Sequence, residues 1–114
     1  IDADYEPLEF GGGYDHNWVL KNGGRFDKVA EAESDKSGIR MEVYTDLPGI
    51  QMYTANFLDN EPGKDGASYI KRSAVCFETQ YYPDAIHHDN FPGPICRKGE
   101  KYDTRTAYRF LTDK

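Results

Sequence analysis

The chain has 114 residues and a formal net charge of −6, a size typical of a single domain. Its acidic balance argues against nucleic acid and anionic membranes as partners. No apolar run approaches the ~18 residues that a membrane-spanning helix needs. Hydrophobic residues make up 38% of the sequence and aromatic residues 14%, including nine tyrosines, a bias that favours strands and contacts with carbohydrate. We therefore expect one segment over residues 1–114, with no nucleic-acid or membrane partner.

The beginning of the sequence and its cysteines give two further expectations. The sequence starts at Ile1 and shows no signal peptide, so we expect processing or a fragment of a longer protein. Cys76 and Cys96 are its two cysteines, too few for a disulfide framework. We expect both to be free thiols in a cytoplasmic protein.

The first predicted strand follows a glycine-rich break. Residues 1–10 are acidic without a clear period, and Pro7 excludes a long helix among them. Gly11–Gly13 then allows the backbone to approach other groups closely. Residues 14–20 run from a polar cluster into an apolar end, which indicates a strand.

The next two strands form a predicted hairpin. Residues 25–34 and 39–46 flank a strong turn signal at residues 34–38. The second of these strands alternates cleanly between apolar and polar residues. The side chains expected to face inward are Ile39, Met41 and Val43.

The rest of the chain alternates strands with polar loops. A break at residues 47–49 precedes a strand over 50–57, and residues 59–66 form a polar loop. Residues 83–94 form a long irregular segment, and the last strand covers residues 102–110. About six strands without a convincing helix predict an all-β, antiparallel β-sandwich.

The strand over residues 75–80 carries the principal candidate for chemistry. Val75 and Phe77 are expected to face a core, so that Glu78 projects from the other face near two tyrosines. A carboxylate enclosed among aromatic and hydrogen-bonding groups suits a sugar site and general-base work. The pattern alone favours a plainer role, a solvent-facing glutamate on a strand.

Several motifs, taken in order and spacing, resemble the C-terminal portion of the aldose 1-epimerase family, also called the galactose mutarotase family. They are Gly13–Asn17, Leu47–Gln51, Tyr53–Leu58 and Phe77–Gln80, followed by Pro83–Ala85 and Asn90–Pro92. The ending over residues 99–110 is also similar to the closing strand of that family. The resemblance covers nearly the whole chain from Gly11 onward.

The resemblance implies part of a large galactose-mutarotase-type β-sandwich that interconverts the α and β anomers of free hexoses such as galactose or glucose. In that family a glutamate takes the proton of the anomeric hydroxyl, and this glutamate matches Glu78. The substrate-binding aspartate of the family matches Asp15, and Gln51 occupies a position where some members contact the sugar. No metal or organic cofactor is implied. The pattern alone favours plainer roles: a turn residue that bonds to its own backbone for Asp15, and an ordinary polar strand residue for Gln51.

The acid that such an enzyme needs is missing from the matched motifs. Family members are considerably longer, and their active-site histidines lie upstream of the portion matched here. We expect His16 to be structural and His87 and His88 to lie on a surface loop. These histidines and Asp89 lack the spacing of metal ligands.

The isolated chain is therefore expected to have little or no activity. Its expected partners are a free aldohexose and either the upstream portion of the same protein or another copy of the chain, which would complete the sheet and the site. Two alternatives stay open. One is a non-catalytic carbohydrate-binding module, and the other is a sugar-6-phosphate 1-epimerase.

Overall fold

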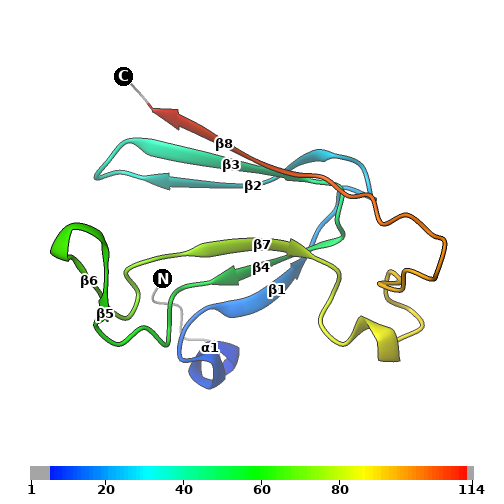
Figure 1. Cartoon of the computed structure of the whole chain (residues 1–114), viewed down its shortest axis with the longest axis horizontal. Helices are drawn as coiled ribbons and strands as arrows, with labels where there is room; N and C mark the ends of the chain where they lie inside the picture. The colour runs from blue at the N-terminus through cyan, green and yellow to red at the C-terminus, as the bar shows by residue number, and fades with distance from the viewer. Residues whose placement is uncertain (1–5, 113–114) are drawn as a thin grey trace. The chain divides into compact units, whose positions relative to one another are not determined.

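The computed structural model describes residues 6–112, in which strands predominate (Figure 1). The strands are β1 (Asp15–Val19), β2 (Asp27–Ser34), β3 (Ile39–Thr45), β4 (Gly49–Tyr53), β5 (Glu61–Pro62), β6 (Ser68–Tyr69), β7 (Cys76–Gln80) and β8 (Thr106–Thr112). The helical elements are α1 (Glu6–Gly11) and two 3-10 helices, η1 (Lys64–Gly66) and η2 (Ala85–His87). The predicted all-β class is confirmed.

The strands form two three-stranded sheets and one two-stranded sheet. Their strand orders are β1-β4-β7, β2-β3-β8 and β5-β6. Strand β3 pairs antiparallel with β2 on one side and with β8 on the other, and β5 pairs antiparallel with β6. Figure 1 shows β3 between β2 and β8, and β4 between β1 and β7. The predicted antiparallel pairing is confirmed in the β2-β3-β8 sheet.

The described residues separate into two compact units. One unit holds the chain up to Trp18 together with Gln51–Glu78. The other holds Val19–Ile50 together with the chain from Thr79 onward. The expectation of a single segment over residues 1–114 stays a prediction.

The β2-β3 hairpin forms where the turn signal predicted it. Ser34 pairs with Ile39 across the turn, and the amide of Gly38 donates to the carbonyl of Ser34 at 2.8 Å. Gly38 has a φ of +66°, a left-handed conformation that glycine adopts without a steric penalty. The hydroxyl of Ser37 also accepts from the amide of Ile39 at 3.3 Å. Local turn chemistry therefore sets the register of the hairpin.

The buried part of β3 differs partly from the expected alternation. Val43 and Thr45 are completely buried, and Met41 is half-buried. Ile39 was predicted to face inward, but this prediction is wrong because Ile39 is 45% exposed next to the turn. Glu42 lies on the opposite face and is nevertheless buried, at 7% exposure.

Glu42 is buried because three side chains satisfy its carboxylate. The hydroxyl of Tyr44 donates at 2.9 Å, the guanidinium of Arg109 on β8 lies at 3.4 Å, and the ammonium of Lys28 on β2 lies at 3.5 Å. The hydrogen bond from Tyr44 lowers the pKa of Glu42 most, and the charges of Lys28 and Arg109 act in the same direction against burial. Glu42 thus links all three strands of the β2-β3-β8 sheet.

The short helix α1 was not predicted. Pro7 lies in its first turn, where the missing amide hydrogen costs nothing. The amides of Gly12 and Gly13 donate to the carbonyls of Glu9 and Leu8 at 3.2 and 2.9 Å, and these bonds end the helix in the manner of a glycine C-cap. None of the helices within residues 6–112 is long and apolar enough to cross a membrane.

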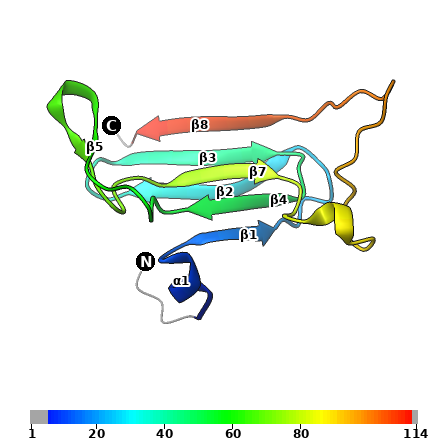
Figure 2. The ribbon, with the colours of Figure 1, turned by 60° about the horizontal axis from the view of Figure 1, so that its bottom comes forward.

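Three expectations for the later segments need correction. The loop over residues 59–66 contains β5, which pairs with β6 and is therefore not wholly irregular. Val75 precedes β7 and is 48% exposed, so it does not face a core. The last strand begins at Thr106, so Tyr102 and Thr104 lie in the connection before it. Figure 2 shows this long connection from β7 to β8, which carries η2.

Candidate functional site

Two of the three predicted site residues contact each other directly. Asp15 is the first residue of β1, and Gln51 is in the middle of the neighbouring strand β4. The Gln51 amide Nε2 donates to Asp15 Oδ1 at 2.8 Å. Asp15 is exposed and Gln51 is half-buried. The alternative of a turn aspartate bonded to its own backbone is wrong, because Asp15 belongs to a strand and its carboxylate accepts from a residue on another strand.

The third predicted residue, Glu78, is in the centre of β7. Because β4 lies between β1 and β7, the residues Asp15, Gln51 and Glu78 come from three successive strands of one sheet. Glu78 is exposed. The enclosure among aromatic side chains that we expected around it is therefore not present in the described chain. In β7 both neighbours of Glu78, Phe77 and Thr79, are half-buried and alternate to the other face.

His16 has a structural position beside Asp15. Its Nδ1 accepts from the backbone amide of Asp15 at 3.0 Å, and its Nε2 lies 3.1 Å from the carbonyl oxygen of Pro7. These two contacts assign the proton to Nε2, which donates to Pro7. His16 thereby joins α1 to β1, and both of its ring nitrogens are used in this link.

His87 and His88 share one carboxylate on the surface. Nδ1 of His87 donates to Asp84, and Nε2 of His88 lies 3.2 Å from the other carboxylate oxygen. The bond from His87, and then that from His88, lowers the pKa of Asp84. Both histidines are exposed as predicted, but His87 is the last residue of η2 and so does not lie in an irregular loop. The His88 ring also lies 4.8 Å from the ring of Phe91, centroid to centroid.

Neither the two cysteines nor any group of metal-binding side chains forms a further candidate site among residues 6–112. Cys76 and Cys96 are exposed free thiols, which confirms the prediction that they are not disulfide-bonded. Within residues 6–112 there is no group of three or more histidine, cysteine, aspartate or glutamate side chains that could hold a metal ion.

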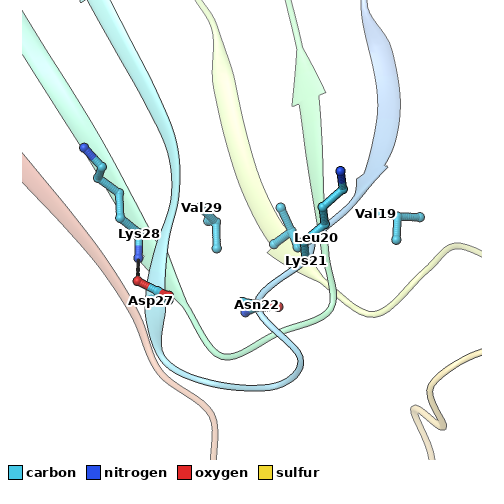
Figure 3. Close-up of a pocket in the computed structure, with 7 residues that line it drawn as sticks. All are labelled: Val19, Leu20, Lys21, Asn22, Asp27, Lys28 and Val29. Atoms are coloured by element: carbon cyan, nitrogen blue, oxygen red, sulfur yellow. Dashed lines mark hydrogen bonds between the residues drawn. The ribbon is translucent and has the colours of Figure 1, made fainter.

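The structure has a cavity of about 350 Å³ where the chain passes from β1 into β2. Figure 3 shows its lining, in which Asn22 lies between residues 19–21 and the start of β2. The amide Nδ2 of Asn22 donates to the carbonyls of Thr45, Arg25 and Leu47 at 2.9, 3.1 and 3.2 Å. Asn22 therefore holds two loops together, and none of the three predicted site residues lines this cavity.

Two polar residues that lie close to Asp15 could not be predicted from the sequence pattern. Thr54 and Asn56 follow β4 and bond to the backbone around Tyr14, the residue before Asp15. Both belong to the motif Tyr53–Leu58, which contributed to the family resemblance. A signal was therefore present, but their burial depends on a contact between segments about forty residues apart, which local pattern does not reveal.

Comparison with known proteins confirms the resemblance. The aldose 1-epimerase family matches residues 3–109. Galactose mutarotase from Homo sapiens is 42% identical over 114 residues, which is 92% of this chain and 33% of the relative. Galactose mutarotase from Mus musculus is 43% identical over 99 residues, covering 86% of this chain and 29% of the relative. Aldose 1-epimerase from Escherichia coli (strain K12) is 34% identical over 104 residues, covering 89% of this chain and 30% of the relative. The chain thus spans about a third of the length of these curated relatives.

Proposed function

Because this chain belongs to the aldose 1-epimerase family, we propose that it supplies the base and part of the sugar site of an enzyme that interconverts the α and β anomers of free aldohexoses such as galactose or glucose. The observation that carries the proposal is the bond from Gln51 to Asp15 at 2.8 Å, on strands that lie in one sheet with the Glu78 strand. These are the three residues that the family resemblance selected.

The proposed chemistry begins at Glu78. Its exposed carboxylate takes the proton from the anomeric hydroxyl, while a separate acid protonates the ring oxygen as the bond from C1 to that oxygen breaks. The open-chain aldehyde rotates about its C1–C2 bond and recloses on either face, with both proton transfers reversed. The reaction has no net change in protons or electrons, and no cofactor takes part in these steps.

Asp15 and Gln51 bind the sugar in this proposal. A carboxylate accepts hydrogen bonds from sugar hydroxyls and so discriminates between their orientations. The amide of Gln51 fixes one carboxylate oxygen of Asp15, which reduces the freedom that the carboxylate loses when sugar binds. The exposed position of Asp15 leaves it accessible to a ligand.

The acid comes from outside this chain in our proposal. Both ring nitrogens of His16 are used in contacts with Pro7 and Asp15, and His87 and His88 bond to Asp84. The remaining part of a longer protein, or a second copy of the chain, would deliver the proton to the ring oxygen.

A non-catalytic carbohydrate-binding module is the second candidate, and the exposure of Glu78 favours it because a general base is usually enclosed. A chimera separates the two functions. In this chimera, residues 1–114 replace the matching segment of human galactose mutarotase. Polarimetry of freshly dissolved α-D-galactose measures its activity.

The enzyme proposal predicts that the chimera accelerates mutarotation while the isolated chain leaves the rate at that of buffer. A chimera that folds and binds galactose without accelerating mutarotation would support the binding module instead. Acceleration by the isolated chain would show that the acid lies within it, or in a second copy of it.

A further inference from the structure

Two polar side chains directly after β4 are buried although the proposed chemistry does not use them. Thr54 is 2% exposed and Asn56 is 3% exposed. Buried polar groups are destabilising unless they form hydrogen bonds. Their partners are backbone groups of the segment that leads into β1. This segment includes Tyr14, the residue immediately before Asp15.

The bonds from these two side chains enclose the Tyr14 backbone. Asn56 Nδ2 donates to the carbonyl of Tyr14 at 2.9 Å and to that of Gly11 at 3.2 Å. The hydroxyl of Thr54 accepts from the amide of Tyr14 at 3.1 Å and donates to Asn56 Oδ1 at 2.8 Å. The amide of Thr54 also donates to the Tyr14 carbonyl, at 3.0 Å. Both the amide and the carbonyl of Tyr14 are therefore held from the end of β4.

The glycines before Tyr14 contact the same group of side chains, Thr54 and Asn56 together with Arg72, which we call the Asn56 cluster. A Cβ atom at Gly13 would lie 2.2 Å from Asn56 Oδ1, so the backbone approaches the Asn56 side chain more closely than any other residue would permit. Arg72 Nη2 donates to the carbonyl of Gly12 at 2.7 Å, and the Arg72 amide donates to the carbonyl of Ala55 at 3.0 Å. The Asn56 cluster thus holds the chain immediately upstream of Asp15 at several successive residues.

Asp15 is consequently attached to β4 at two levels. Its carboxylate accepts from Gln51, on β4, and its backbone is fixed through Thr54 and Asn56, which follow that strand. A carboxylate that binds sugar hydroxyls must be placed closely, because a hydrogen bond weakens steeply once its distance and angle depart from their preferred values. We propose that Asn56 is a positioning residue that sets the sugar-binding geometry of Asp15 through the backbone of Tyr14, with Thr54 orienting the Asn56 amide.

This inference rests on the proposed function, in which Asp15 binds the sugar. The test uses the chimera with the substitution Asn56→Asp, which keeps the shape of the side chain but places a carboxylate oxygen against the carbonyls of Gly11 and Tyr14. The matched control is Asn60→Asp, the same chemical change at an exposed asparagine that donates to Asp59.

The readout is the division of the effect between KM and kcat for galactose. Displacement of Asp15 weakens sugar binding, so Asn56→Asp is expected to raise KM about 10-fold or more and to change kcat about 3-fold or less. A purely structural role would instead reduce the fraction of folded enzyme, lowering apparent kcat and leaving KM unchanged. Asn60→Asp is expected to change neither constant.

A double-mutant cycle with Asp15→Ala tests whether Asn56 acts through Asp15. If it does, Asn56→Asp adds little to the KM of the Asp15→Ala chimera, whereas independent effects would multiply. Should Asn56→Asp prevent folding, Thr54→Val makes the milder change, because it removes the hydroxyl that contacts both Tyr14 and Asn56. Thr54→Ser is then expected to restore KM.

The outcomes distinguish this inference from the function on which it rests. An inactive parent chimera would overturn the proposed function. An active parent in which Asn56→Asp and Thr54→Val lower only apparent kcat, or in which the effects of Asn56→Asp and Asp15→Ala on KM multiply, would overturn the positioning role of Asn56 and leave the function intact.

Discussion

Replacement of Gly13 by alanine is expected to destabilise the protein through two separable effects. Gly13 has a φ of +144°, a region that is nearly restricted to glycine and costs another residue about 1–3 kcal/mol. The added Cβ would also lie 2.2 Å from Oδ1 and 2.8 Å from Cγ of Asn56. Asn56 is held by hydrogen bonds to Gly11, Tyr14 and Thr54, so it cannot move aside without breaking them.

The size of the effect follows from adding these contributions. Overpacking of a closely packed site costs about 1–3 kcal/mol, so Gly13→Ala should lower the free energy of unfolding by roughly 2–6 kcal/mol in total. Gly24→Ala is the matched control. Gly24 has a φ of +77°, and no heavy atom lies within 4 Å of the position of its Cβ, so it should cost only the backbone strain of about 1–2 kcal/mol.

Urea unfolding of the chimera and of both variants measures these differences, provided that the dependence of the unfolding free energy on urea stays the same. In a background with Asn56→Ala, the two Asn56 atoms nearest the new Cβ are gone and Arg72 Nη2 remains at 3.2 Å. The further cost of Gly13→Ala should then fall toward that of Gly24→Ala. Equal costs for the two glycine substitutions in the parent background would refute the close contact of Gly13 with Asn56.

Three further predictions concern stability, each measured by urea unfolding of the chimera. Val43→Ala removes two methyl groups from a completely buried side chain and should lower the free energy of unfolding by about 2–3 kcal/mol. The same change at the half-exposed Val75 should lower it much less. Equal losses of unfolding free energy would contradict the burial of Val43. Asn22→Ala should cost about 1–3 kcal/mol because it leaves loop carbonyls without their donor, and a neutral result would show that Asn22 does not hold the loops. The hydrogen bond from Tyr44 lowers the pKa of Glu42, so ionised Glu42 stabilises the fold above the ordinary glutamate pKa of about 4.3, and this contribution disappears as the pH falls through the lower pKa of the folded state. Glu42→Gln should therefore lower the free energy of unfolding at pH 7, and the difference in this free energy between variant and parent should narrow below about pH 4. A free-energy difference that does not depend on pH would exclude an ionic role for Glu42.

Much of the strand pattern could be predicted because it depends on local signals. The β2-β3 hairpin combines clean alternation in β3 with a turn that contains Gly38, and both signals act within a few residues. Helix α1 was missed because its six residues include Pro7 and show no helical period of apolar residues. Its end depends on hydrogen bonds from the amides of Gly12 and Gly13 to carbonyls of the helix. The burial of Glu42 was missed because its partners Lys28 and Arg109 come from other strands.

The candidate site shows the same division between local and distant causes. Asp15, Gln51 and Glu78 could be selected from motifs that resemble a known family, and the structure adds that Asp15 and Gln51 form a hydrogen bond. The roles of Thr54 and Asn56 could not be predicted, because their partners lie about forty residues away in the sequence. Enclosure of Glu78 was expected and is not observed, since an aromatic-rich sequence neighbourhood does not determine which side chains surround a carboxylate.

The most direct test of the central claim compares galactose binding and mutarotation in one preparation of the chimera with Glu78→Gln. Glu61→Gln, the same change at an exposed glutamate on β5, serves as the control. If Glu78 is the general base, Glu78→Gln should lower the polarimetric rate by a factor on the order of 100–10,000, while the dissociation constant for galactose measured by calorimetry changes little. An unchanged rate in Glu78→Gln would contradict the assignment of Glu78 as the base.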